Sequence, residues 1–137
     1  MTDGLVRAAA HLTERWRAHP DERPALRAPL ARLAGRFRAE ADACRERGDL
    51  RVAVAQRRRE LALRRRLDDP HETTGTLLAL VDDYRGLGAR RQVLDCADEV
   101  LAIARVHRDE PAIVEAHRRL HALLAEFGRP EAVRHDP

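Results

Sequence analysis

The sequence predicts an all-α fold, a short α-solenoid of about six antiparallel helices with no strands. Three observations predict it. Ala, Leu, Arg and Glu dominate the composition, and all four are strong helix formers. Apolar residues recur at spacings of three and four, and no stretch alternates with a period of two. Gly48, Gly88 and Gly128 each follow such an apolar segment and stand forty residues apart, which indicates a repeated helical hairpin.

The first two helices are marked by apolar stripes on either side of a polar loop that two prolines bracket. The first stripe covers residues 5–16. The second runs over residues 26–44, with Pro24 or Pro29 near the start of its helix. We expect Gly48 to end this second helix, because glycine adopts the left-handed conformation that closes a helix.

Start and stop signals also frame the third and fourth helices. The third is expected to begin near Asp49, a favoured N-cap residue, and to run to about Leu67. The dipeptide Asp69-Pro70 then breaks the chain. Thr73 or Thr74 is expected to cap the fourth helix, which Gly88 ends.

The fifth and sixth helices complete the set. Residues 93–104 carry the stripe of the fifth. Asp109 and Pro111 are expected to open the sixth as its N-cap and its first-turn proline. Gly128 is expected to end it. The 137 residues then fit one domain, residues 1–128, with a short C-terminal tail at 129–137.

The amino-acid palette excludes several classes of site. All 26 basic residues are arginine, and the chain has no Lys, Ser or Asn. A serine nucleophile, a phosphate-binding loop with its lysine and an N-glycosylation site are therefore excluded. Cys44 and Cys96 lack the spacing of a metal or redox motif and are expected to be small buried residues, with a disulfide as the alternative. No apolar run reaches the length of a membrane span, so we expect no membrane association and a cytoplasmic location.

Positive charge is concentrated in one expected helix. Residues 51–66 carry seven arginines against Glu60 alone, a formal charge of +6, whereas residues 67–137 carry nine against fourteen acids, a charge of −5. A solvated helix face is one interpretation. The other is a docking strip for an acidic partner or a nucleic acid. The basic strip is Arg57, Arg58, Arg64 and Arg65. No aromatic residue lies near it to stack on bases, which argues against nucleic acid.

One histidine pair has the spacing of two metal ligands on a helix. His117 and His121 are four residues apart, a spacing that can hold a metal ion on a helix. The intervening residues lack the glutamate of zinc proteases, and a third ligand would have to come from His107 or Glu126. A polar helix flank is the favoured interpretation. We therefore expect no metal, no cofactor and no catalytic residue.

The segment 77–104 resembles a tetratricopeptide repeat, a helix–turn–helix unit. Leu77, Leu80-Val81, Tyr84 and Gly88 fill the places of that motif's first helix and turn, and the likeness extends over about residues 30–128. The period of forty exceeds the family's usual 34, and the usual proline is displaced to Pro70. A generic helical repeat and a six-helix bundle stay open.

The resemblance implies a non-enzymatic interaction module that binds a protein or peptide in a concave groove. Long-period repeats of this look occur in bacterial regulators, which implies a regulatory role. Mapping the family's groove positions gives Arg38, Asp42, Arg45, Leu78, Asp82, Arg85 and Arg118. The recurring arginines suit a carboxylate, so an acidic ligand is the expected partner.

Two alternatives stand beside the groove hypothesis. Arg38–Asp42 and Asp82–Arg85 could be surface ion pairs within their own helices. The alternative function is a nucleic-acid-associated or transcription-regulatory accessory protein that uses the basic strip. Self-association through an exposed end of the stack is also open.

Overall fold

The computed structural model describes the backbone of residues 2–108 and 110–135 and the side chains of residues 3–108 and 110–125. Within these ranges the chain forms six α-helices and no strand, which confirms the predicted all-α class. The helices are α1 (Thr2–Ala18), α2 (Arg23–Glu46), α3 (Leu50–Arg66), α4 (Pro70–Gly86), α5 (Arg90–Val106) and α6 (Pro111–His135), with a 3₁₀ turn, η1 (Pro20–Glu22), between the first two.

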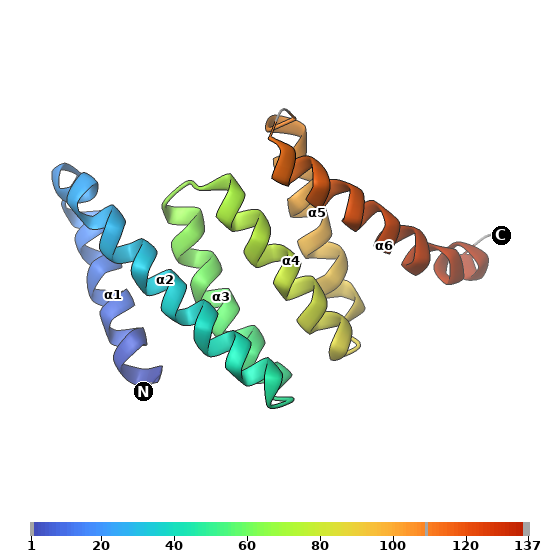
Figure 1. Ribbon diagram of the computed structural model, residues 1–137, viewed down its shortest axis with the longest axis horizontal. Helices are drawn as coiled ribbons and strands as arrows, with labels where there is room; N and C mark the ends of the chain where they lie inside the picture. Colours follow the sequence, from blue (N-terminus) through green and yellow to red (C-terminus); the bar gives the residue numbers. More distant parts are fainter. Residues whose placement is uncertain (1, 109, 136–137) are drawn as a thin grey trace.

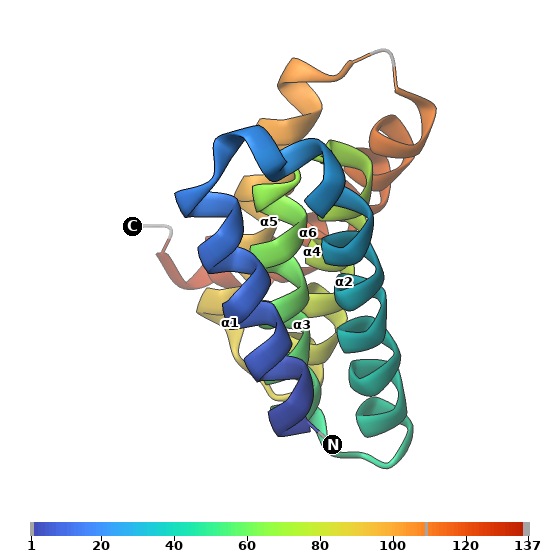
Figure 2. The same ribbon diagram turned by 90° about the vertical axis from the view of Figure 1, so that its left-hand side faces the viewer.

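Consecutive helices pack against each other and build a solenoid-like stack of two layers. Helices α1, α3 and α5 form one layer, and α2, α4 and α6 form the other (Figures 1 and 2). None of the helices within the described ranges is both long and apolar enough to cross a membrane.

The three inner turns share one geometry. Gly48 and Gly88 end α2 and α4 with φ of 81° and 69°, as predicted. At each turn the backbone N–H groups of the left-handed residue and of the next one donate to carbonyls of the last helical turn, as from Asp49 to Cys44 at 2.8 Å. Asp68 takes the same conformation, with φ of 53°, between α3 and α4. Helices α3, α4 and α5 are therefore equal in length, 17 residues each, and begin at positions 50, 70 and 90.

Two of the predicted helix boundaries are wrong. Neither Thr73 nor Thr74 caps α4, because the helix begins earlier, at Pro70, and Asp69 is its cap. The Asp69 carboxylate accepts from the backbone N–H of Glu72 at 3.1 Å. Helix α6 does not end at Gly128, since its backbone continues to His135.

The other predicted signals have mixed outcomes. Asp49 stands at the N-cap of α3, as predicted, although its side chain makes no capping hydrogen bond. Pro24 lies in the first turn of α2, and Pro29 lies inside the helix. Pro111 opens α6, and Asp109 lies outside the described residues.

Two apolar clusters form the core. The first joins α1 and α2 to the end of α3 and consists of Leu5, Leu26, Leu30, Leu33, Ala34, Phe37, Leu63 and Leu67. The second joins α3 to α6 and consists of Val54, Leu61, Leu77, Leu80, Val81, Val93, Ala97, Val100, Ala116 and Leu120. Helix α3 contributes residues to both clusters and therefore connects them.

Candidate functional site: a charged seam and a groove along α4

Eight charged side chains meet where α2, α3 and α4 come together, on the face of α3 between the two apolar clusters. We refer to them as the charged seam: Arg38, Asp42, Arg45, Arg57, Glu60, Arg64, Glu72 and Asp83. Four arginines face four carboxylates, so the formal charge of the seam is zero. Four members are buried (Arg57, Glu60, Arg64 and Asp83), and the other four are partly exposed. Because buried ions are stable only when they are paired and hydrogen-bonded, the balance of charge is what allows these four to lie inside the fold.

One half of the seam is built on Glu60, whose side chain is fully buried. Its Oε2 atom accepts from the Nε atoms of Arg38 at 2.8 Å and of Arg64 at 3.3 Å. A terminal nitrogen of Arg38 donates in turn to Glu72 Oε1, also at 2.8 Å. A single guanidinium therefore links α2 to both α3 and α4.

The other half is built on Asp83, which is also fully buried. Its Oδ2 atom accepts from Arg57 Nε at 2.6 Å, and its Oδ1 atom accepts from Arg45. A terminal nitrogen of Arg57 lies 2.9 Å from Asp42 Oδ1. This half repeats the arrangement of the first, with one buried carboxylate shared between two arginines.

Burial and pairing act in opposite directions on the seam arginines. Burial of the Arg57 guanidinium disfavours its charged form, but the hydrogen bonds and charges of Asp83 and Asp42 outweigh this effect, so its pKa is raised. The pKa of Arg38 is raised for the same reason by Glu60 and Glu72. A raised arginine pKa stabilises the fold at every pH below the ordinary arginine value, so Arg38 and Arg57 stay charged at neutral pH.

The seam corrects several site predictions. Arg38, Asp42 and Arg45 were expected to line the partner-binding groove, but their charged groups bind other side chains of the seam. Arg38 also lines a cavity beside α4, as predicted. The Arg38–Asp42 surface pair is also wrong, because each of the two residues pairs with a different helix.

The predicted basic strip is not one surface. Arg57 and Arg64 are buried in the seam, whereas Arg58 and Arg65 are exposed on another side of α3. Residues one apart on a helix differ by about 100° in direction, so adjacent arginines cannot share a face. Arg65 is neutralised across the layer by Glu99, whose Oε2 atom lies 3.0 Å from its Nε.

A groove runs along α4 between α2 and α6, and we refer to it as the α4 groove. It consists of two adjoining cavities of about 320 and 400 Å³, both lined by Leu78. Around the first stand Arg38, His71, Glu72, Thr74, Gly75, Ala112, Ile113 and Ala116. Around the second stand Val81, Asp82, Arg85, Arg119, Leu120, Ala122 and Leu123. The structure thus brings the predicted Leu78, Asp82 and Arg85 together on one surface.

The α6 side of the groove differs from the prediction by one residue. Arg118 does not line either cavity, and its terminal nitrogen lies 2.6 Å from Glu115 Oε2 in an exposed pair. Its neighbour Arg119 lines the groove instead. The reason is that the connection before α6 is one residue longer than the forty-residue repeat predicts. Helix α4 begins at Pro70 and α6 at Pro111, which is 41 positions later.

A third surface lies in the other layer, between α3 and α5, over a cavity of about 290 Å³. Arg58 and Arg65 of α3 face Asp95 and Glu99 of α5 there, with Cys96 between them. Burial, with the charges of Glu99 and Asp95, raises the pKa of the Cys96 thiol to about 11. This thiol therefore stays protonated and is a poor nucleophile at neutral pH. Cys44 and Cys96 are both free.

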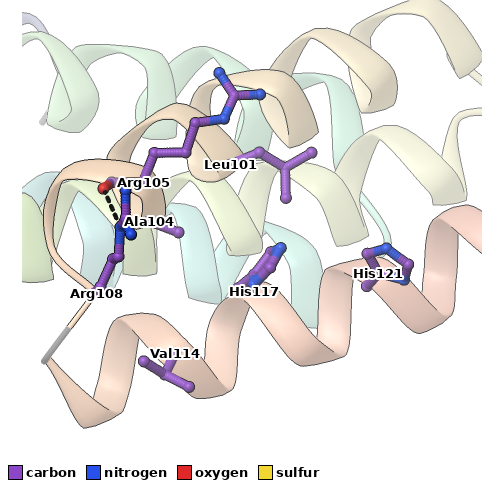
Figure 3. Close-up of a pocket in the computed structure, with 7 residues that line it drawn as sticks. All are labelled: Leu101, Ala104, Arg105, Arg108, Val114, His117 and His121. Atoms are coloured by element: carbon purple, nitrogen blue, oxygen red, sulfur yellow. Dashed lines mark hydrogen bonds between the residues drawn. The ribbon is translucent and has the colours of Figure 1, made fainter.

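Another hollow, of about 460 Å³, lies at the α5–α6 end of the stack (Figure 3). His117 and His121 line it, with their rings edge to face and their centroids 5.9 Å apart. No group of three metal-binding side chains occurs among the residues that the structure describes.

No protein-family model, no curated protein and no solved structure matches this chain. The resemblance to tetratricopeptide repeats therefore stays a prediction, and the proposals below depend on the geometry of the chain itself.

Proposed function

We propose that this protein is a non-enzymatic interaction module that binds a protein or peptide segment in the α4 groove. The observation that carries the proposal is the pair of adjoining cavities that share Leu78. Side chains from three helices surround them, so a ligand lying there would contact α2, α4 and α6 at once. A surface of this extent suits a segment of chain better than a small metabolite.

The character of the groove indicates what kind of segment it would take. Leu78 and Leu123 offer apolar contact, and Asp82, Arg85 and Arg119 offer hydrogen bonds and charge. Because Arg38 is held by Glu60 and Glu72, the α2 side of the groove contributes little free positive charge. We therefore propose a ligand of mixed character, with one or two carboxylates near Arg119, in place of a strongly acidic ligand.

A selection from a random peptide library on the immobilised full chain tests this proposal. Binders are expected to lose at least about tenfold in affinity, about 1.4 kcal/mol, on the double variant Arg119→Glu with Ala122→Glu. The matched control is Arg91→Glu with Ala102→Glu, the same two substitutions at exposed positions of α5. Circular dichroism checks that both variants keep their helices. If the two double variants bind selected peptides equally well, the groove is not the binding site.

The alternative, a nucleic-acid-associated protein, now has less support. The strip on which it depended is divided between a buried seam and an exposed pair with Glu99. It predicts salt-dependent retention on DNA or RNA that Arg58→Glu weakens, and retardation on a gel measures this directly.

A further inference from the structure

The two ends of the helical stack differ in how much apolar surface they expose. At the α1 end, the apolar residues of the outer helix, such as Leu5, pack on α2. At the other end, within the described residues, no helix lies against α5 and α6 on their outer side (Figure 1). Two of the three most exposed large apolar residues described, Val106 and Val114, belong to these two helices.

The side chains around the hollow at this end combine apolar and cationic groups. Leu101, Ala104 and Val114 are its apolar part. Its polar part consists of Arg105, Arg108, His117 and His121, and none of the lining residues that the structure describes is a carboxylate. Figure 3 shows these side chains from α5, the loop and α6 around one space. We refer to these seven residues as the end surface.

The molecule itself contains a covered version of this surface. Helices α3 and α5 have the same length and begin forty positions apart, so Leu61 and Arg65 of α3 occupy the same helical positions as Leu101 and Arg105 of α5. On α3, Leu61 is buried, and Arg65, 52% exposed, lies beside α5 over the cavity between the two helices. Helix α5 supplies Asp95 and Glu99 there, and Glu99 pairs with Arg65 through both of its carboxylate oxygens.

We infer that the end surface binds an acidic amphipathic helix of another protein, which lies on α5 and α6 as α5 lies on α3 and α4. The carboxylates of that helix face Arg105 as Glu99 faces Arg65. Its apolar stripe covers Leu101 and Val114. This surface is separate from the α4 groove, so the inference does not depend on the proposed function.

Charge complementarity selects this occupant over a second copy of the chain. Two end surfaces placed face to face would bring Arg105 and Arg108 of both copies together, and no carboxylate among the seven residues of the end surface would separate them. Helix α5, the element with the right acidic face, is already packed inside each copy. An external helix with carboxylates four residues apart avoids this repulsion between arginines, and it is not already packed inside the chain.

A peptide with the sequence of α5, residues 90–106, is the probe, because it carries the covering face in full. It has Ala in place of Cys96 and a side-chain staple that keeps it helical, since a free helix of this length is marginal in water. Fluorescence anisotropy measures its affinity for the full chain. Methyl chemical shifts of Leu101 and Val114 locate the bound peptide.

A charge exchange tests the specific contact. Arg105→Glu in the chain is expected to weaken peptide binding about tenfold, and Glu99→Arg in the peptide to weaken it similarly. Combining the two changes is expected to restore most of the affinity. Raising the salt to about 1 M, where the Debye length is about 3 Å, is expected to weaken the original pair.

The control compares two exposed valines of similar accessibility. Val114→Glu, 37% exposed at the end surface, is expected to reduce binding at least about tenfold, whereas Val52→Glu, 43% exposed on α3, leaves it unchanged. The inference is overturned if the peptide does not bind, if the exchange of charges fails to restore affinity, or if the two valine variants behave alike. It is also overturned if sedimentation shows a dimer that Val114→Glu dissociates, because the occupant is then a second copy.

Discussion

Helix α4 packs against α2 and α3 through charged side chains and against α5 and α6 through hydrocarbon. Two apolar residues of α3, Val54 and Leu61, also join the hydrocarbon side. Glu72 and Asp83 face the first pair of helices, each bonded to arginine. Leu80 and Val81 belong to the apolar cluster that includes the second pair. The turns at the two ends of α4 have the same geometry, so the difference lies in side-chain chemistry alone.

The comparison separates two ways of holding helices together. A hydrocarbon contact is stabilising at many relative positions, because the hydrophobic effect has no direction. An arginine–carboxylate contact is favourable only when donors and acceptors meet within hydrogen-bond range. We therefore expect the seam to fix which faces of α2, α3 and α4 meet, while the apolar side of α4 contributes most of the net stability.

The largest effect is expected from removing one buried carboxylate of the seam. Asp83→Leu removes the fully buried partner of Arg57, 2.6 Å from its Nε, and leaves only the largely exposed Asp42 beside it. Breaking a buried ion pair in this way costs about 3–5 kcal/mol in the free energy of unfolding. Urea unfolding followed by circular dichroism measures it. Glu115→Leu, which removes a carboxylate from the exposed pair with Arg118, is the control and is expected to change stability by less than about 1 kcal/mol. If the two variants lose the same free energy of unfolding, removing a carboxylate from the buried seam costs no more than removing one from an exposed pair.

On the apolar side of α4, Leu80→Ala is expected to cost about 3 kcal/mol. The side chain is 1% exposed, and its loss removes buried methyl groups and leaves a cavity. The same unfolding experiment measures it, with Val52→Ala at an exposed position of α3 as control. A loss below about 1 kcal/mol would mean that the neighbouring helices close the cavity by shifting, and that this interface is looser than the packing indicates.

A smaller effect, about 1 kcal/mol, is expected from Asp69→Ala at the start of α4. The substitution removes the acceptor for the Glu72 N–H but leaves both interfaces of α4 in place. Thermal unfolding of this variant should therefore remain a single transition, displaced to lower temperature. Two separate transitions would instead show that the seam and the apolar cluster unfold independently.

Local signals predicted most of the fold. The apolar stripes predicted the helices, and Gly48 and Gly88 predicted two of the turns. Glycine favours the left-handed conformation that ends a helix, so its position in the sequence indicates the turn. Asp69-Pro70 predicted the third turn, but not its left-handed residue, because Asp68 takes that conformation without being glycine. The cap of α4 was readable: Asp69 followed by Pro70 is an N-cap followed by a first-turn proline.

The site was less predictable because its decisive contacts join different helices. Sequence spacing could assign Leu78, Asp82 and Arg85 to one side of α4. It could not show that the charge of Arg57 is met by Asp83, 26 residues away. Even so, Glu60 was a signal, since it is the single acid in a segment of seven arginines. A lone acid in such a segment marks the side of the helix on which counter-charges gather.

The smallest effect is expected from replacing a whole ion pair. In the double variant Arg57→Met with Asp83→Leu, neither buried charge remains, and hydrocarbon of similar volume fills the space, a change that is often neutral or stabilising. Asp42 and Arg45 lose their partners but are 57% and 44% exposed, so water can hydrate them. We expect a free energy of unfolding within about 1 kcal/mol of the parent chain, against the loss of about 3–5 kcal/mol for Asp83→Leu alone. Such recovery would mean that the Asp83→Leu cost comes from stranding Arg57, and that the pair specifies the register of α2, α3 and α4 at almost no net gain in stability. If the double variant instead loses as much free energy of unfolding as its two single variants together, the ion pair is a net stabiliser. Both sides of α4 would then contribute net stability, one through ion pairs and the other through hydrocarbon.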